Sequence, residues 1–263
     1  MPGEGAPYFE WETVQLTEAV LANLTEHELT DVEFFAFEDT AEDRRRSGGP
    51  GSGGPRCKVM PGDAEWPSPM TWTVANLLTG GALIPTTPLA APCYAGPHYN
   101  TTKCDEITAR WSDPRLHVSD PASNHFPIFQ GLTCLPPSLR DTGTCELGGY
   151  AAYSVRIQNV AQIQLAINFA RNRNLRLVVK NTGHDFGDKS IGAGALSIWT
   201  HGLKDLQFFE SYTFGSYSGP AFKLGAGVAT EEVYLAAEQN NVTVVGGECR
   251  VCVPFHRPVL PGL

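Results

Sequence analysis

A histidine flanked by glycines, near the middle of the chain, is the first residue whose surroundings suggest chemistry. An apolar run ending at Lys180 is followed by Asn181, Thr182, Gly183, His184, Asp185, Phe186 and Gly187. A strand that delivers a histidine onto a turn between glycines lets the backbone approach a bulky ligand while the imidazole faces it. Consecutive backbone N–H groups in such a turn can also hold a pyrophosphate. The segment therefore predicts a site for a phosphate-bearing cofactor.

The glycine spacing argues against the common nucleotide-binding motifs. The glycines at 183, 187, 192 and 194 do not form G-x-G-x-x-G, and the run from Leu196 to Thr200 alternates like a strand instead of opening a helix. The chain also contains no G-x-x-x-x-G-K-[ST] loop and no H-E-x-x-H helix. A nicotinamide-type turn, a Walker phosphate loop and a zinc-protease helix are therefore not expected.

The stretch from Tyr153 to Cys249 resembles the first half of the PCMH-type FAD-binding domain of oxidases related to vanillyl-alcohol oxidase and berberine bridge enzyme, especially their secreted fungal members. The segment from Cys57 to Ser68 resembles the same proteins just before that domain. The family carries its flavin covalently on a Gly-His pair, through the 8α-methyl group, and the matching residue here is His184. A second family signature, Gly-Gly-x-Cys, can attach a sulfur to C6 of the flavin, and Cys249 stands in that place.

The resemblance implies FAD as the cofactor and hydride transfer from an alcohol, sugar or secondary-metabolite substrate to flavin N5, with O2 as the final acceptor. It gives a set of cofactor-binding candidates, which comprises Asn181, Thr182, Gly183, His184, Asp185, Gly187, Gly246, Gly247 and Cys249. The family's second flavin lobe and substrate domain have no counterpart in this sequence. No catalytic base is therefore assigned, and no metal site is expected.

Each candidate also has an ordinary structural interpretation. His184 can be a turn residue bonded to the backbone, and Asp185 can cap the same turn. Gly183 and Gly187 can simply take positive φ angles. Cys249 can be a disulfide partner or a buried thiol, and it can attack a flavin only if it is not in a disulfide. These alternatives stay open at the level of sequence.

The surrounding pattern predicts an α+β fold that opens strand-helix-strand. Residues 153–157 alternate like a strand, Val160, Ile163, Ile167 and Ala170 share a helical face, and Leu175 to Lys180 reads as the next strand. This order places the His184 loop at the carboxyl end of a strand, where α/β sheets usually bind ligands. Further elements are expected in four places: a short helix over 17–24, a strand over 222–228, a helix from Thr230 to about Asn240, and a strand over 242–245.

Composition divides the rest of the chain. Residues 1–56 form an acidic segment with a Gly-rich linker, 57–149 an irregular Cys- and Pro-rich region, 150–250 the partial FAD-binding domain and 251–263 an aberrant, proline-rich tail. The first 46 residues carry 12 acidic side chains against three arginines, which accounts for the whole net charge of −9. A basic footprint for nucleic acid is absent, and nothing predicts attraction to a membrane.

Cysteines and sequons indicate an oxidising compartment. Cys93 with Cys104 and Cys134 with Cys145 are plausible short-loop disulfides, leaving Cys57 for Cys252, for another chain or free. Three N-x-[ST] sequons permit glycosylation, at Asn23, Asn100 and Asn241. Secretion is inferred from these features and the resemblance, because no signal peptide is visible.

Three functions remain open from sequence alone. The first is an FAD-dependent oxidase with a covalently held flavin. The second is an incomplete, non-catalytic fragment of such an enzyme. The third is a secreted, disulfide-stapled binding module without flavin, in which the His184 loop would be purely structural.

Overall fold

A four-stranded sheet forms the centre of the computed structural model, which describes residues 6–26, 31–37, 57–126, 128 and 130–254. The strands are β1 (Leu83–Pro85), β2 (Tyr153–Arg156), β3 (Leu177–Lys180) and β4 (Leu196–Trp199), in the order β1-β2-β4-β3. β4 pairs in parallel with both β2 and β3, whereas β1 pairs antiparallel with β2. The predicted Gly-rich linker and residues 255–263 of the predicted tail lie outside the described residues.

The predicted strand-helix-strand opening is confirmed. Helix α7 (Val160–Asn172) connects β2 to β3, and the Asn159 side chain caps it by accepting a hydrogen bond from the Gln162 N–H at 3.0 Å. The predicted helical face is confirmed only in part, because Ala170 and Ile163 pack in the core and Ile167 does not. Leu165 and Phe169 are buried, whereas Ile167 is 42% exposed. Leu165, Ala166, Phe169 and Ala170 recur at the three- and four-residue spacing of one helical stripe, and this stripe faces the sheet.

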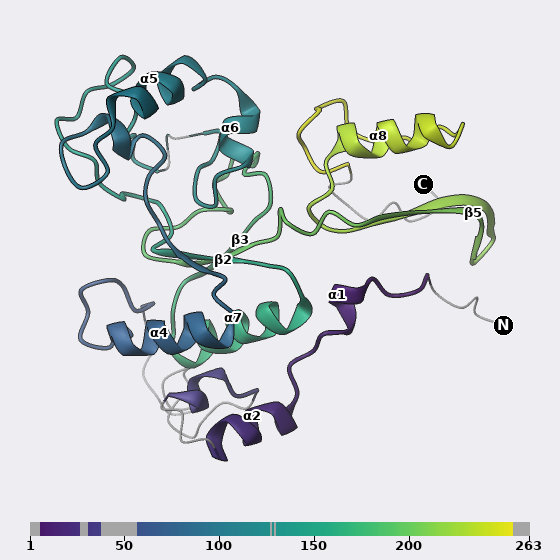
Figure 1. Ribbon diagram of the computed structural model, residues 1–263, viewed down its shortest axis with the longest axis horizontal. Coiled ribbons are helices and arrows are strands. Elements are labelled where there is room, and N and C mark those ends of the chain that lie inside the picture. The colour runs from purple at the N-terminus through teal and green to yellow at the C-terminus, as the bar shows by residue number, and fades with distance from the viewer. Residues whose placement is uncertain (1–5, 27–30, 38–56, 127, 129, 255–263) are drawn as a thin grey trace.

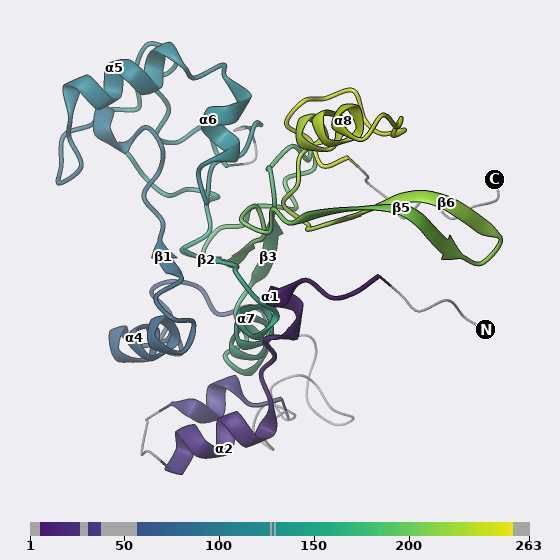
Figure 2. The ribbon, with the colours of Figure 1, turned by 45° about the vertical axis from the view of Figure 1, so that its right-hand side comes forward.

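One face of the sheet forms the main hydrophobic core together with α7 and α4 (Pro69–Leu78), which lie on the same side of it (Figures 1 and 2). Phe169 is at the centre of this core. Its ring stacks on Phe35 at 4.9 Å and meets Trp72 edge-on at 5.2 Å, while Trp72 in turn stacks on Tyr153 of β2. Aromatic packing therefore joins both helices to the sheet.

The described part of the acidic amino-terminal segment joins this core. It contains α1 (Glu10–Thr13), α2 (Glu18–Glu26) and η1 (Val32–Phe35), so a helix is confirmed near the predicted 17–24. Leu16, Leu21 and Phe35 are buried against the core. The Asn168 amide of α7 donates to the Phe35 carbonyl at 2.9 Å, so a polar side chain on α7 holds η1 in place.

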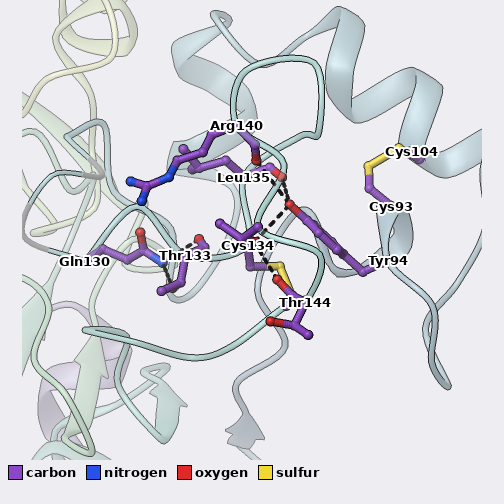
Figure 3. The surroundings of a disulfide bond; sticks show 11 residues. Cys93, Tyr94, Cys104, Gln130, Thr133, Cys134, Leu135, Arg140 and Thr144 are labelled. Atoms are coloured by element: carbon purple, nitrogen blue, oxygen red, sulfur yellow. Dashed lines mark hydrogen bonds between the residues drawn. A yellow bond between two sulfur atoms is a disulfide. The ribbon is translucent and has the colours of Figure 1, made fainter.

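The cysteine-rich region is more regular than predicted, because it contains α4, η2 (Ala91–Cys93), α5 (Thr101–Ala109) and α6 (Pro114–Val118). Both predicted disulfides are confirmed, Cys93–Cys104 and Cys134–Cys145. Figure 3 shows Tyr94 between them. The Tyr94 hydroxyl donates to the Leu135 carbonyl at 2.5 Å, so a buried side chain ties the two disulfide loops together.

A two-stranded hairpin and a helix follow the sheet. The hairpin comprises β5 (Leu206–Phe214) and β6 (Tyr217–Leu224) and extends away from the sheet, with α8 (Thr230–Gln239) beside it (Figure 1). Strand β5 was not predicted, and β6 begins and ends earlier than the strand predicted over 222–228. The predicted helix from Thr230 is confirmed, and Ala229 is its N-cap.

The predicted strand over 242–245 was wrong. These residues adopt no regular structure, and Val245 is 87% exposed. A strand needs a hydrogen-bonded neighbour, and no ladder in the described part of the chain includes these residues. An apolar run alone could not reveal that the neighbour is missing.

The central packing of Phe169 gives a stability prediction. Phe169→Ala should lower the free energy of unfolding by about 3–5 kcal/mol, because it leaves a cavity between Phe35 and Trp72. Ile167→Ala on the exposed side of the same helix should cost about 0.5 kcal/mol or less. Urea denaturation measures both, and equal losses would contradict the assigned core.

The second disulfide gives another prediction. Replacing both Cys134 and Cys145 by alanine should destabilise the protein by roughly 2–4 kcal/mol, because the loop is no longer closed in the unfolded chain. Cys57→Ser is the matched control, since Cys57 is exposed and unpaired. A thermal melt in which the double variant and the control coincide would show that the bridge contributes no stability.

Candidate functional site

The His184 loop begins where β3 ends, at the carboxyl edge of the parallel strands. Gly183 is buried with φ +79°, a conformation that side chains rarely adopt. A Cβ at this position would lie 3.1 Å from the Ser123 carbonyl oxygen and 3.2 Å from the Lys180 side chain. Glycine is therefore required both by the turn and by the segment packed against it. Gly187 does not have a positive φ angle. The expected left-handed glycine conformation is therefore confirmed for Gly183 only.

A second histidine covers the imidazole of His184. His125 stacks on it with ring centroids 3.8 Å apart and an interplanar angle of 6°. The backbone N–H of His125 donates a hydrogen bond to the Gly183 carbonyl at 3.1 Å. A backbone bond and a ring contact thus hold the two segments together, and they fix the direction in which His184 points.

His125 stays neutral in this position. Burial is the main cause that lowers the pKa of His125 to about 3, and the nearby cationic forms of His184, His117 and Lys180 lower it further. His117 lies next in line, with its ring 5.4 Å from that of His125. Its two ring nitrogens hydrogen-bond Ser123 Oγ and the Trp111 carbonyl, each at 2.7 Å. This network orients the inner histidine.

A buried lysine supports the histidine-bearing segment from the sheet. Lys180, the last residue of β3, is fully buried and donates to the Asp120 carbonyl at 2.8 Å. Burial lowers the pKa of Lys180 to about 8, and burial also raises the pKa of Asp120. The Asp120 carboxylate accepts backbone N–H bonds from Ala122 at 2.9 Å and Ser123 at 2.6 Å. Lysine and aspartate together shape the turn that leads to His125.

The Cys249 loop is held by the amino-terminal end of α8. The Thr230 N–H donates to the Cys252 carbonyl at 2.9 Å, and the Glu231 N–H donates to the Arg250 carbonyl at 3.0 Å. The first N–H groups of a helix need such acceptors from outside the helix. The Tyr234 hydroxyl adds a bond to the Gly247 carbonyl at 2.8 Å. The loop is thereby positioned by a helix instead of by the predicted strand.

The fold brings the two predicted nucleophiles together. A ring nitrogen of His184 and the sulfurs of Cys249 and Cys252 all lie within 4.8 Å of one another, although the histidine and the cysteines belong to distant parts of the sequence. The structure pairs Cys249 with Cys252 in a disulfide, and Cys57 is free and exposed. Of the three alternatives for Cys57, the structure therefore shows the free thiol, and Cys252 pairs with Cys249 instead. Cys249 is a nucleophile only when its disulfide is open.

The other predicted cofactor residues lie on the same two loops. The Asn181 amide donates to the Ala226 carbonyl, and the Asp185 carboxylate accepts the Ser190 N–H at 3.3 Å, which orders the turn. Thr182 is buried beside Gly183. Gly246 lies against Tyr234, since an added Cβ would be 3.1 Å from its hydroxyl, while Gly247 is open to solvent.

Four residues of this site were not predicted from the sequence: His125, His117, Asp120 and Lys180. Three of them come from the region interpreted as irregular, where no periodicity marks a facing side chain. Lys180 carried a usable signal, because it ends the apolar run of β3 two residues after the inward-facing Val178. A cation at an inward position of a strand requires buried acceptors.

Comparisons with known proteins match a large part of this chain to a small part of each relative. The VAO-type flavoprotein oxidase VAO615 of Thermothelomyces thermophilus is 41% identical over 198 residues, which are 74% of this chain and 34% of that protein. The FAD-linked oxidoreductase patO of Aspergillus clavatus is 44% identical over 193 residues, 73% of this chain and 33% of that protein. The chain thus spans about a third of the length of these relatives. No family model matches it.

Solved structures give the same result. The crystal structure of the VAO-type flavoprotein MtVAO615 from Myceliophthora thermophila superimposes with a TM-score of 0.71 at 40% identity, over 74% of this chain and 36% of the other. MtVAO713 from the same organism gives a TM-score of 0.70 at 33% identity, over 76% of this chain and 36% of the other. The arrangement of the described elements is therefore that of part of a VAO-type flavoprotein.

The buried histidine gives a pH prediction. Between pH 6.5 and about 3 the unfolded chain protonates His125 and the folded chain does not, so the free energy of unfolding falls as the pH drops through this window. His125→Phe keeps a ring against His184 but cannot titrate, and it should reduce the slope of this pH dependence. Denaturant midpoints measured across the window test it. The exposed His98→Asn is the control, and equal slopes in the wild type and in His125→Phe would contradict the assignment.

Proposed function

Because this chain belongs to the VAO/BBE-type family of FAD-linked oxidoreductases, we propose that it forms the FAD-holding part of an oxidase and carries the flavin covalently on His184. When bound, FAD would supply the hydride acceptor for an alcohol, sugar or secondary-metabolite substrate and would pass the electrons to O2. The single observation that carries the proposal is the meeting of His184 and Cys249 at one place.

The residues present fit such a cofactor. The buried Gly183 allows the backbone of the loop to come close to a large ligand, and exposed Gly187 and Gly247 leave room on either side. Asn181, Thr182 and Asp185 shape the same loop, and Gly246 shapes the facing one. The His184 ring is held from one side by His125. Pre-positioning an imidazole in this way lowers the entropy cost of bringing it to an electrophilic carbon.

His125 is a positioning residue in this proposal. Its low pKa keeps the ring neutral at physiological pH, so it places no positive charge against His184. A cation there would reduce the nucleophilic strength of the imidazole beside it. Lys180 acts one step further away, by holding the turn at Asp120.

Cys249 can add a second attachment under one condition. The nucleophile is the thiolate, and a sulfur in a disulfide is not a thiolate. Attachment to C6 of the flavin therefore requires the dithiol form of Cys249 and Cys252. His184 has no such requirement. We therefore expect one bond through His184 in the oxidised protein, and a second through Cys249 only after the disulfide opens.

Disulfides and glycosylation sequons support the proposal that the protein is secreted. Disulfides persist in oxidising surroundings, and the structure contains Cys93–Cys104, Cys134–Cys145 and Cys249–Cys252 among the described residues. The sequon asparagines Asn23, Asn100 and Asn241 are exposed, as a glycan requires. Among the described helices, none has the length and apolar character needed to cross a bilayer. We propose secretion with glycosylation.

A second candidate function is a stapled binding module without flavin. The compact disulfide region around Tyr94 is the observation that favours it, because it holds its own small core apart from the sheet. A third alternative, a fragment without catalytic activity, stays a prediction for this chain, which spans about a third of the length of the matched relatives.

The visible absorption spectrum of the purified protein, taken before and after acid precipitation, tests the flavin proposal. We expect a yellow pellet that keeps the flavin bands, and His184→Ala should lose all of the acid-stable colour because it removes the attacking nitrogen. Cys57→Ser is the control and should keep it. A colourless wild-type protein would contradict the proposal, as would acid-stable flavin that survives in His184→Ala.

A further inference from the structure

The cluster that joins the two predicted flavin loops has a third member, Cys252, that the flavin proposal does not use. One ring nitrogen of His184 and the sulfurs of Cys249 and Cys252 lie within 4.8 Å of one another, and all three residues are partly buried. We propose that the dithiol form of the flavin-free protein binds one zinc ion through His184, Cys249 and Cys252. This inference does not depend on flavin attachment.

The ligand types select the metal. Two thiolates and an imidazole form a borderline-soft set that suits zinc, whereas magnesium and calcium prefer oxygen ligands. Two thiolates and a neutral imidazole also balance the double charge of the ion, which suits a partly buried position. Three protein ligands leave the fourth tetrahedral position open to water.

The geometry needs only small adjustments. In tetrahedral zinc sites, with Zn–S near 2.3 Å and Zn–N near 2.0 Å, the ligand atoms lie about 3.5–3.8 Å apart. The two cysteines lie three residues apart on one turn, closed by a hydrogen bond from the Cys252 N–H to the Cys249 carbonyl at 3.3 Å. Once the disulfide is open, rotation of the two side chains can bring the sulfurs to this separation.

Both halves of the site are held by other contacts. The turn carrying the cysteines is bonded to the first N–H groups of α8, through Thr230 and Glu231. His184 is held by the ring of His125 and by the buried Gly183. The ligands would therefore be positioned before the metal arrives, which is the condition for tight binding by a small site.

The reaction balances when a reductant is supplied. A phosphine donates two electrons to the Cys249–Cys252 bond and becomes the phosphine oxide. Water supplies the oxygen of the oxide and the two protons of the thiols. Zinc binding then forms two Zn–S bonds and releases two protons, one from each thiol. The imidazole donates its lone pair without losing a proton. The disulfide form offers no thiolates and should not bind the metal.

Cobalt serves as the visible probe, because it takes the same tetrahedral ligands as zinc. Flavin-free full-length Cys57→Ser protein, which lacks the exposed free thiol, is reduced with one equivalent of a phosphine. Protein in which peptide mass analysis shows Cys93–Cys104 and Cys134–Cys145 still paired is then titrated with Co²⁺. We expect sulfur-to-cobalt charge-transfer absorption and tetrahedral d–d bands that saturate at one equivalent and are abolished by one equivalent of Zn²⁺. Protein that has not been reduced should show neither band.

Ligand variants identify the donors. Cys249→Ser, Cys252→Ser and His184→Ala should each weaken zinc binding by more than the roughly 10–100-fold that outer-shell changes cost. His125→Phe should keep the bands, because His125 only packs on the ligand. Alkylation followed by peptide mass analysis is a second measurement, since zinc should protect Cys249 and Cys252 of the folded protein from the reagent.

Three outcomes would overturn the site. Reduced protein without cobalt bands would exclude it. Bands that persist unchanged in His184→Ala would assign cobalt binding to the cysteines alone. Bands that are lost in His125→Phe but kept in His184→Ala would show that His125, and not His184, is the ligand. None of these results depends on whether the acid precipitate of the flavin experiment is yellow, so the two proposals fail separately.

Discussion

Burial of one face of the four-stranded sheet against α7 and α4 is the constraint on which the rest of the structure depends. Side chains alternate along a strand, so burying Val155, Leu196 and Ile198 in the core turns their neighbours to the opposite face. Ser154, Ser197, Lys180 and Trp199 lie there, and their register is fixed by the parallel ladders. The polar face is therefore a consequence of the apolar one.

That polar face explains why residues from the cysteine-rich region reach the candidate site. Ser154 donates to the Pro121 carbonyl at 3.3 Å and Lys180 donates to the Asp120 carbonyl at 2.8 Å, so the sheet binds the backbone of this segment directly. The segment then carries His125 onto His184. A buried cation with a depressed pKa is an expensive group to place in a core, and its backbone acceptors offset that cost. Polar contacts thus assemble the site across a face that also buries Trp199 and Val178.

The sequence predicted the elements that carry strong local signals. The strands β2, β3 and β4 and the helices α7 and α8 were predicted from their apolar periodicity. The glycines around His184 marked it as a candidate residue. Residues that depend on distant partners were not found. His125 stands in a segment without periodicity, and its position follows from Lys180 and Gly183, which lie far along the chain. The strand expected over 242–245 failed for the same reason, because pairing is not encoded in the run itself.

The two confirmed disulfides also constrain the order of assembly. Each joins cysteines 11 positions apart, and all four cysteines precede β2 in the chain. Neither disulfide therefore includes a residue of β2, β3 or β4. During synthesis from the amino terminus in an oxidising compartment, both loops can close before those strands exist. The later strands then pack against a cysteine-rich region whose two disulfides are already closed. Only the Cys249–Cys252 disulfide remains to form after the sheet.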